Sequence, residues 1–335
     1  MKTKCLLFLS VFFLSFNGFA QGLYVTKYSD LDYSGYASIS ELDKTTGEVI
    51  YNHVFSTDYV GMLTYDATTN EIYAISGDYQ IIKYNILTKT ETYFPLPDSP
   101  EMYFLYNMII ANGRLFVTRG DYFGKTTLLE LNKTTGEVID SYDFNTTNDY
   151  VWGLTYDASN NEIYAISSCD KIIKYNILTK TETYFYLPNL SEIYYYSVRM
   201  IIVDGRLFLT REDDSVNSFI LELNKTTGEV IDTYVFSTTN HAPIYVSYNA
   251  STNEIYGMAR GMIEDIIIIK YNIATKTETY VSMPDMYYSG MIIVDDNTSD
   301  VNTILSNEGS KPVRAFNLFG QEVPLNTNSL SILFN

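Results

Sequence analysis

Three cationic side chains recur at the same point of a repeated phrase, and carboxylates follow each of them closely. Lys27 lies in "VTKY", Arg119 in "VTRG" and Arg211 in "LTRE". The acidic neighbours are Asp30, Asp121, Asp213 and Asp214. Ammonium and guanidinium groups form strong hydrogen bonds with carboxylates and hydroxyls. The three cations therefore either pair locally with these aspartates or contact the carboxylate or hydroxyl groups of a ligand.

Aromatic residues accompany these charges in the segments that connect the repeated phrases. Tyr150 and Trp152 lie in "DYVW", and Tyr195 lies in "IYYY". Rings beside orienting charges are typical of sites that bind sugars or peptides. Rings that only cover the ends of strands would give the same pattern, and this alternative stays open. The candidate ligand-binding set is Lys27, Asp30, Arg119, Asp121, Tyr150, Trp152, Tyr195, Arg211, Asp213 and Asp214.

The sequence offers little for catalysis. Its two histidines, His53 and His241, are far apart in the chain, and no serine-nucleophile, zinc-protease, Walker or dinucleotide motif is present. Carboxylates are abundant, so the alternative function is a polysaccharide hydrolase or lyase with acids at the mouth of a channel. "SDLDYSG" (residues 29–35) and "REDDSVN" (residues 211–217) faintly resemble calcium loops but lack EF-hand spacing. We predict no catalytic residue, no cofactor and no metal centre, and keep bound calcium as an open alternative.

Charge and cysteine content limit the partners and the compartment. The chain carries 22 basic and 40 acidic residues, for a formal net charge of −18, which argues against nucleic acid as a partner. Residues 1–20 combine two lysines, an apolar run and small residues before Gln21, as a secretory signal peptide does. Its removal would leave only Cys169, so we expect no internal disulfide. No later segment is apolar enough to span a membrane.

The elements that must position these residues repeat along the chain. "ELDKTTGEVI" or "ELNKTTGEVI" begins at Glu41, Glu130 and Glu222, and "KYNILTKTETY" or "KYNIATKTETY" begins at Lys83, Lys174 and Lys270. These are six units of two alternating kinds at a spacing of about 45 residues, each with four short strand signals. The pattern predicts an all-β fold, a six-bladed β-propeller of four-stranded antiparallel blades. Because two kinds of unit alternate, we expect its symmetry to be closer to three-fold than to six-fold.

The two ends of the repeat are incomplete in complementary ways. The segment from Leu23 onwards supplies the second, third and fourth strands of a unit, whereas "SGMIIVDD" (residues 289–296) supplies an innermost strand alone. We expect the C-terminal strand to join the N-terminal blade and to close the ring, because closure removes an open sheet edge. Met291, Ile292, Ile293 and Val294 would then be buried.

Two resemblances extend this prediction. Through "LNKTTGEV" the repeat resembles the quinoprotein-like and NHL-like propellers in style. The segment "KPVRAFNLFGQEV" (residues 311–323) resembles the C-terminal sorting segment of cargo of the type IX secretion system of Bacteroidetes, through Val313, Phe316, Asn317, Leu318, Gly320, Gln321 and Val323. It lacks that family's Pro-Asn-Pro entry and is short for a full sorting domain, so an ordinary β-hairpin is the alternative. The resemblance implies an export address that engages secretion machinery, or a surface anchor.

These patterns together predict a signal peptide over residues 1–20, a propeller over residues 21–299 and a tail over residues 300–335. We expect an exported protein, extracellular or on the outer cell surface, that binds a protein or carbohydrate ligand without catalysis. The predicted binding face is the one that carries the links between blades. A structural role in a surface layer or in gliding is a third possibility, because one fold supports many functions.

Overall fold

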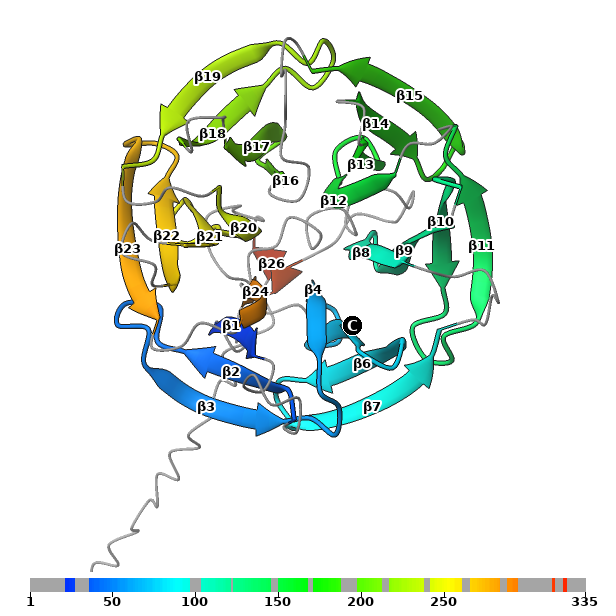
Figure 1. Ribbon diagram of the computed structural model, residues 1–335, viewed down its shortest axis with the longest axis vertical. Helices are drawn as coiled ribbons and strands as arrows, with labels where there is room; N and C mark the ends of the chain where they lie inside the picture. The colour runs from blue at the N-terminus through cyan, green and yellow to red at the C-terminus, as the bar shows by residue number, and fades with distance from the viewer. Residues whose placement is uncertain are drawn as a thin grey trace, which may run out of the picture. The chain divides into compact units, whose positions relative to one another are not determined.

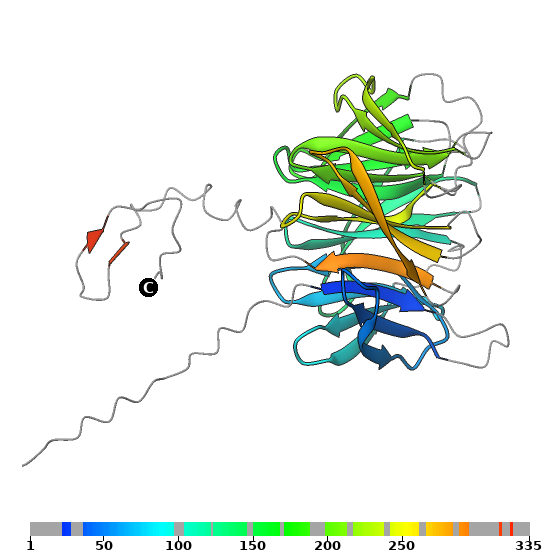
Figure 2. The same ribbon diagram turned by 90° about the vertical axis from the view of Figure 1, so that its left-hand side faces the viewer.

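The computed structural model describes residues 22–27, 36–96, 104–121, 123–145, 150–167, 171–187, 198–212, 217–237, 242–260, 266–283, 288–294, 315–316 and 322–323. The predicted all-β fold is confirmed: six four-stranded antiparallel sheets are arranged around a central axis as the blades of a propeller (Figure 1). Turned by 90°, the ring of blades is seen edge-on (Figure 2). The chain divides into two compact units, residues 1–298 and 299–335, and the propeller belongs to the first.

Each blade runs from an innermost strand beside the central channel to an outermost strand at the rim. Blade 1 comprises β24 (Tyr288–Val294), β1 (Gly22–Lys27), β2 (Ser38–Leu42) and β3 (Val49–Val54). Blade 2 comprises β4 (Val60–Asp66), β5 (Glu71–Ser76), β6 (Gln80–Asn85) and β7 (Thr90–Pro95). Blade 3 comprises β8 (Phe104–Ala111), β9 (Arg114–Gly120), β10 (Thr126–Leu131) and β11 (Val138–Asp143).

The second half of the ring repeats this order. Blade 4 comprises β12 (Val151–Asp157), β13 (Glu162–Ser167), β14 (Lys171–Asn176) and β15 (Thr181–Tyr186). Blade 5 comprises β16 (Arg199–Val203), β17 (Arg206–Glu212), β18 (Ser218–Leu223) and β19 (Val230–Val235). Blade 6 comprises β20 (Ile244–Asn249), β21 (Glu254–Arg260), β22 (Ile266–Asn272) and β23 (Thr277–Met283). None of the described residues forms a helix that could cross a membrane.

One turn recurs between the third and fourth strands of every blade. In blade 1 the Asp43 carboxylate accepts hydrogen bonds from the backbone N–H groups of Thr45 and Thr46, both at 2.8 Å, and Gly47 N–H donates to the Asp43 carbonyl at 2.9 Å. Asn85 builds the same turn in blade 2. A short Asp or Asn side chain satisfies backbone donors that the turn leaves without strand partners. The aspartate and asparagine series of the repeat therefore has a structural cause.

The two kinds of blade differ in the residue at the last position of this turn. Lys89 occupies it in blade 2 with a φ of 57°, so the positive φ alone does not require glycine. The odd-numbered blades have glycine there because their turn packs against the preceding blade. A Cβ added to Gly136 would lie 2.4 Å from the ring of Phe94, and one added to Gly228 would lie 2.4 Å from the ring of Phe185. Glycine at this position therefore serves the contact between blades as well as the turn conformation.

The hydrophobic core consists of apolar layers between neighbouring blades. The layer between blades 6 and 1, for example, contains Leu23 and Ile293 of blade 1 together with Met258 and Ile268 of blade 6. A comparable cluster fills every other junction of the ring. Because each blade buries both of its faces against neighbours, the fold depends on a complete ring.

The C-terminal strand closes this ring, as the sequence predicts. β24 pairs antiparallel with β1, so that Leu23 lies opposite Ile293 (Figure 1). Met291, Ile293 and Val294 are buried. Ile292 is only half-buried, contrary to the prediction, because it lines the central channel.

Hydroxyl groups connect the innermost strands of neighbouring blades at every second junction. A threonine or serine of an even-numbered blade accepts a hydrogen bond from a backbone N–H of the next blade. The bonds join Thr64 to Ile110 (3.0 Å), Thr155 to Ile202 (3.0 Å) and Ser247 to Ile293 (2.9 Å). Each bond satisfies a backbone donor on the channel edge of a blade, where no further strand is available. The contacts thus repeat with the three-fold alternation that the sequence predicts.

Candidate functional site

The three predicted cations occupy equivalent positions but do not form a common site. Lys27 ends β1, and Arg119 and Arg211 lie near the ends of β9 and β17, in alternate blades. The Lys27 ammonium lies 5.8 Å from the ring centroid of Tyr288, and the Arg211 guanidinium lies 6.0 Å from that of Phe219. Each of these two cations therefore contacts a ring of its own blade, and none of the three lines the central channel.

The other predicted site residues are distributed in the same way. The Asp121 carboxylate accepts backbone hydrogen bonds from Phe123 (2.8 Å) and Lys125 (2.9 Å), so it holds the turn between β9 and β10. Tyr150 lies just before β12, and Trp152 is the second residue of that strand. The remaining candidates lie outside the described residues: Asp30, Tyr195, Asp213 and Asp214.

Neither calcium nor histidine chemistry gains support from the part of the chain that the structure describes. No three His, Cys, Asp or Glu side chains come together there as a metal site would require. The two loops that resemble calcium loops lie largely outside the described residues, as does His241. His53 contacts Glu91, with 2.6 Å between Nε2 and Oε2, on the outermost strands of blades 1 and 2. That contact joins two blades at the rim, away from the channel.

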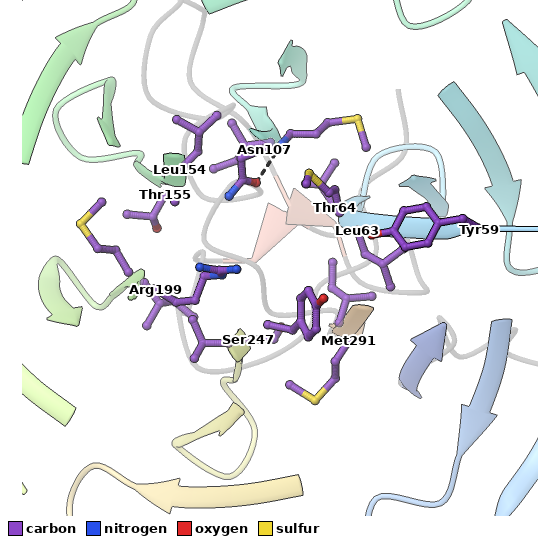
Figure 3. Close-up of a pocket in the computed structure, with 18 residues that line it drawn as sticks. Tyr59, Leu63, Thr64, Asn107, Leu154, Thr155, Arg199, Ser247 and Met291 are labelled. Atoms are coloured by element: carbon purple, nitrogen blue, oxygen red, sulfur yellow. Dashed lines mark hydrogen bonds between the residues drawn. The ribbon is translucent and has the colours of Figure 1, made fainter. Parts of the chain in front are cut away.

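The innermost strands of all six blades enclose a pocket of about 260 Å³ in the central channel (Figure 3). Four methionines belong to the strands of its wall: Met62, Met108, Met200 and Met291. The Met62 side chain is half-buried, whereas those of Met108, Met200 and Met291 are buried in the apolar layers between blades. Its polar side chains are Tyr59, Thr64, Asn107, Thr155, Arg199, Tyr245 and Ser247. The threonines and the serine already accept hydrogen bonds from neighbouring blades. The other polar groups of the wall are the amide of Asn107, the guanidinium of Arg199 and the two tyrosine hydroxyls.

Arg199 gives this pocket its charge. It is the first residue of β16, and its side chain extends into the pocket (Figure 3). Its Nη1 donates a hydrogen bond to the Val198 carbonyl at 2.8 Å. Burial lowers the pKa of the Arg199 guanidinium from its ordinary value, and nearby Tyr245 opposes this shift. Among the described residues that line the pocket, Arg199 is the one cation, and none is a carboxylate.

The copies of the repeat differ from one another at the residue that faces this pocket. The phrase Met-Ile-Ile occurs in blades 1, 3 and 5, and the residue before it is Gly290, Asn107 and Arg199 respectively. Gly290 is closely packed, because an added Cβ would lie 2.8 Å from Thr26 Oγ1 and 3.0 Å from Leu63 Cγ. One side of the channel is thus filled by Leu63, and another carries the guanidinium. Comparing the aligned copies position by position could have found this signal, which the sequence analysis missed.

The even-numbered blades contribute a bulge at the same level of the channel. The register of the innermost strand shifts after Gly61, Trp152 and Ile244. The residues that follow have positive φ: Met62 (57°), Gly153 (63°) and Tyr245 (54°). This conformation is unfavourable for methionine and tyrosine, and bulges of this kind often redirect side chains at binding sites. The bulge places three chemically different residues at equivalent positions of alternate blades around the pocket.

Comparisons with known proteins identify the fold but no family. No protein-family model and no curated protein sequence matches the chain. One similar solved structure is TolB from Acinetobacter baumannii, with a TM-score of 0.60 and 12% identity over 83% of this chain and 67% of that one. Another is a chain of the nidogen/laminin complex, with a TM-score of 0.58 and 12% identity over 82% of this chain and 98% of that one. At such identity the similarity shows the fold alone: the chain is a six-bladed β-propeller with a pocket in its channel. The likeness in style to quinoprotein-like and NHL-like propellers stays a prediction.

Proposed function

We propose that this chain is an exported propeller that binds a ligand through its central channel and the adjoining face. The observation that carries the proposal is the composition of the channel pocket. Its described lining residues offer a guanidinium, an amide and two phenols beside apolar walls, which are groups that hold and orient a ligand. Hydrolysis of a glycoside needs two carboxyl groups about 5–10 Å apart, and these lining residues supply no carboxyl group.

The pocket adjoins the face that the sequence analysis selected. Tyr59 precedes the innermost strand β4, and Arg199 begins β16, so both stand where links from preceding blades enter the channel wall. Lys27, Arg119 and Arg211 end their strands toward the same face. A ligand that enters the channel from this side would pass these cations. The similarity to a propeller in the nidogen/laminin complex supports a protein partner, and the phenols and cations are equally suited to a sugar.

Export and sorting are the second part of the proposal. Residues 1–20 have the pattern of a signal peptide, and residues 311–323 resemble a type IX sorting segment. Two short strands of the second compact unit, β25 (Ala315–Phe316) and β26 (Glu322–Val323), pair antiparallel within that segment. A strand-forming tail agrees with a sorting role. We infer that the mature chain acts outside the cell or on its outer surface.

Arrays of glycans and peptides probed with the mature chain, residues 21–335, test the binding function. We expect specific capture without cleavage of the captured compound. Replacing Arg119 and Arg211 together by alanine should weaken capture by about 1–3 kcal/mol, the value of charge-assisted hydrogen bonds, and should leave the melting temperature nearly unchanged.

The matched control for this experiment is Lys44→Ala, at the turns of the opposite face. Lys133 and Lys225 occupy the same turn in other blades but are unsuitable, because each pairs with a buried aspartate. Cleavage of captured glycans would contradict the proposal. Loss of capture in the Lys44 variant, with the double arginine variant unaffected, would show that the binding face is assigned wrongly.

A further inference from the structure

The hairpin that ends blade 4 differs from that of blade 2 at two positions only. Residues 80–96 read "QIIKYNILTKTETYFPL", and residues 171–187 read "KIIKYNILTKTETYFYL". Gln80 pairs with Pro95 across the strands of blade 2, and Lys171 pairs with Tyr186 across those of blade 4. Both differences therefore fall on one cross-strand pair. Because the same hairpin forms with either pair, folding does not require the lysine or the tyrosine.

In blade 4 this pair completes a cluster of two exposed rings and a cation. Tyr184 is 53% exposed and Tyr186 is 59% exposed. Their ring centroids lie 5.6 Å apart, and the rings are nearly perpendicular. The Lys171 ammonium lies 4.9 Å from the ring centroid of Tyr184 and 5.9 Å from that of Tyr186. The cluster lies on β14 and the outermost strand β15, at the rim of the propeller (Figure 1), and none of its residues lines the channel pocket.

The corresponding ring of blade 2 has a structural role that the rings of blade 4 lack. The Tyr93 hydroxyl donates a hydrogen bond to Glu91 at 2.8 Å and accepts one from Ser56 at 3.2 Å, so it joins blade 2 to blade 1. Within the described part of the chain, no hydrogen bond occupies the hydroxyl of Tyr184 or that of Tyr186. Both hydroxyls can therefore bond to a ligand.

The lysine of the cluster is likewise available to a ligand. No carboxylate of the described residues pairs with the Lys171 ammonium. Glu182, on the same strand as the two rings, accepts hydrogen bonds from the Tyr142 hydroxyl at 3.1 Å and from the Asn145 backbone N–H at 3.0 Å. That carboxylate therefore serves the contact between blades 3 and 4. A cation without a counter-ion beside two rings is a local site for one negative group.

The two rings indicate what carries the negative group. A tyrosine presents an apolar ring face and a hydroxyl that both donates and accepts hydrogen bonds. A sugar complements it, because C–H groups cover the faces of a sugar ring and hydroxyls surround its edge. A protein partner needs about 800 Å² of surface with an apolar centre, whereas the exposed neighbours on β15 are Thr181 and Thr183. The formal net charge of −18 disfavours a polyanion.

We propose that Lys171, Tyr184 and Tyr186 form a rim site for a carbohydrate that carries an isolated carboxylate, such as a terminal uronic acid. The ammonium pairs with the carboxylate, and the exposed tyrosines contact the sugar ring and its hydroxyls. This site goes beyond the proposed function, since it lies outside the channel and takes a stated class of ligand.

The test compares the binding of cellobiouronic acid and cellobiose, two disaccharides that differ in one carboxylate. Calorimetry or ligand-detected NMR measures their binding to the mature chain. We expect the acid to bind roughly fivefold more tightly, the effect of one partly exposed ion pair. The preference should shrink in about 0.5 M NaCl, because salt screens exposed charges. Equal binding of the two sugars, or no binding of either, would overturn the proposal, and so would tighter binding of trigalacturonate, a polyanion.

The chain itself supplies the decisive variant and its control. Lys171→Gln combined with Tyr186→Pro reproduces the pair of blade 2, so this double variant should fold and melt as the wild-type protein does. It should lose the preference for the acid. Tyr186→Ala, which keeps the backbone N–H, should weaken the binding of both sugars. Tyr280→Ala is the matched control, because Tyr280 corresponds to Tyr184 in blade 6 and is 54% exposed.

The Tyr280 variant should bind both sugars as the wild-type protein does. An unchanged preference in the double variant, or an equal loss in the Tyr280 variant, would show that the cluster is not the site. Array peptides that need Lys171 and Tyr186, with neither sugar bound, would replace the carbohydrate by a protein partner and overturn the proposal. Array ligands that bind the double variant as well as the wild-type protein, with neither sugar bound, would also overturn it but leave the proposed channel function standing.

Discussion

A mature chain that ends before Tyr287 is expected to remain unfolded, whereas one that ends after Ser299 is expected to fold. The shorter chain lacks all of β24, the innermost strand of blade 1. It loses the burial of Met291, Ile293 and Val294, worth about 1.5–3 kcal/mol for each side chain. Together these losses approach the whole stability of a typical domain, about 5–15 kcal/mol. The longer chain keeps every strand of the propeller.

Circular dichroism melting curves of the two truncated chains decide this point. Equal melting temperatures would contradict ring closure by β24. The longer truncation, expressed with residues 1–20, also tests the sorting role of the tail. It should fold but fail to reach the cell surface or the medium, and normal delivery without the tail would refute the sorting proposal while leaving the closure of the ring intact.

Replacing Lys225 by alanine should destabilise the propeller by about 3 kcal/mol. The Lys225 ammonium donates a hydrogen bond to the Asp157 carboxylate, which joins blade 5 to blade 4. The Asp157 side chain is only 2% exposed. Loss of the lysine would leave a buried carboxylate without its countercharge, and such losses typically cost about 3–5 kcal/mol. Chemical denaturation of the two proteins at neutral pH measures the difference.

The control for this prediction comes from blade 6, where an uncharged residue occupies the position of Asp157. The residue that corresponds to Asp157 in blade 6 is Asn249, whose Oδ1 accepts a hydrogen bond from Ser251 Oγ at 2.7 Å, as Asp157 Oδ1 does from Ser159 Oγ at 2.6 Å. An uncharged amide therefore fits this position of the repeat. Adding Asp157→Asn to Lys225→Ala should restore most of the lost stability. A double variant as unstable as the single variant would show that the charge is not the cause.

The same contact predicts a dependence on pH. Burial disfavours the charged form of Asp157, but hydrogen bonds from Lys225 and Ser159 outweigh burial and lower the pKa of its carboxyl below the ordinary value. Its contribution to stability is therefore present above the unfolded pKa of about 4 and lost as pH falls through the lower folded pKa. Without Lys225, burial favours the protonated acid. The destabilisation caused by Lys225→Ala should thus be smaller near pH 4 than at pH 7, and an equal effect at both would contradict this account.

Much of the fold could be predicted because local chemistry and the global repeat agree. Asn112-Gly113 and Asp204-Gly205 have positive φ at all four residues, as their two-residue hairpin turns require. The incomplete first unit and the isolated "SGMIIVDD" strand identify ring closure, since neither can bury its edge alone. The partial exposure of Ile292 was not predicted. The residue type alone does not show whether the side chain of an apolar strand residue faces a neighbouring blade or the channel.

The candidate site was harder to predict for a related reason. Arg199 lies directly before "MII" at the start of an apolar strand, and this sequence context does not indicate that its side chain faces a pocket. Lys27, Arg119 and Arg211, in contrast, recur at the same point of a repeated phrase. The regular spacing of these three cations favoured them as candidate site residues. A residue that recurs in several copies can, however, have a structural role in each copy and no role in binding. The channel pocket depends on positions where aligned copies differ. Only the ring geometry shows that these positions meet around one cavity.

Methionine methyl NMR tests the central claim, that ligand binding occurs in the channel, most directly. Met62 is half-buried and lines the pocket, whereas Met258 and Met283 are buried between blades 6 and 1 and do not line it. Titrating the ¹³C-methyl-labelled mature chain with a ligand captured on the arrays should shift the Met62 signal along a saturable binding curve and leave the Met258 and Met283 signals unchanged. An unchanged Met62 signal at saturating ligand, or equal shifts of all three signals, would contradict the claim.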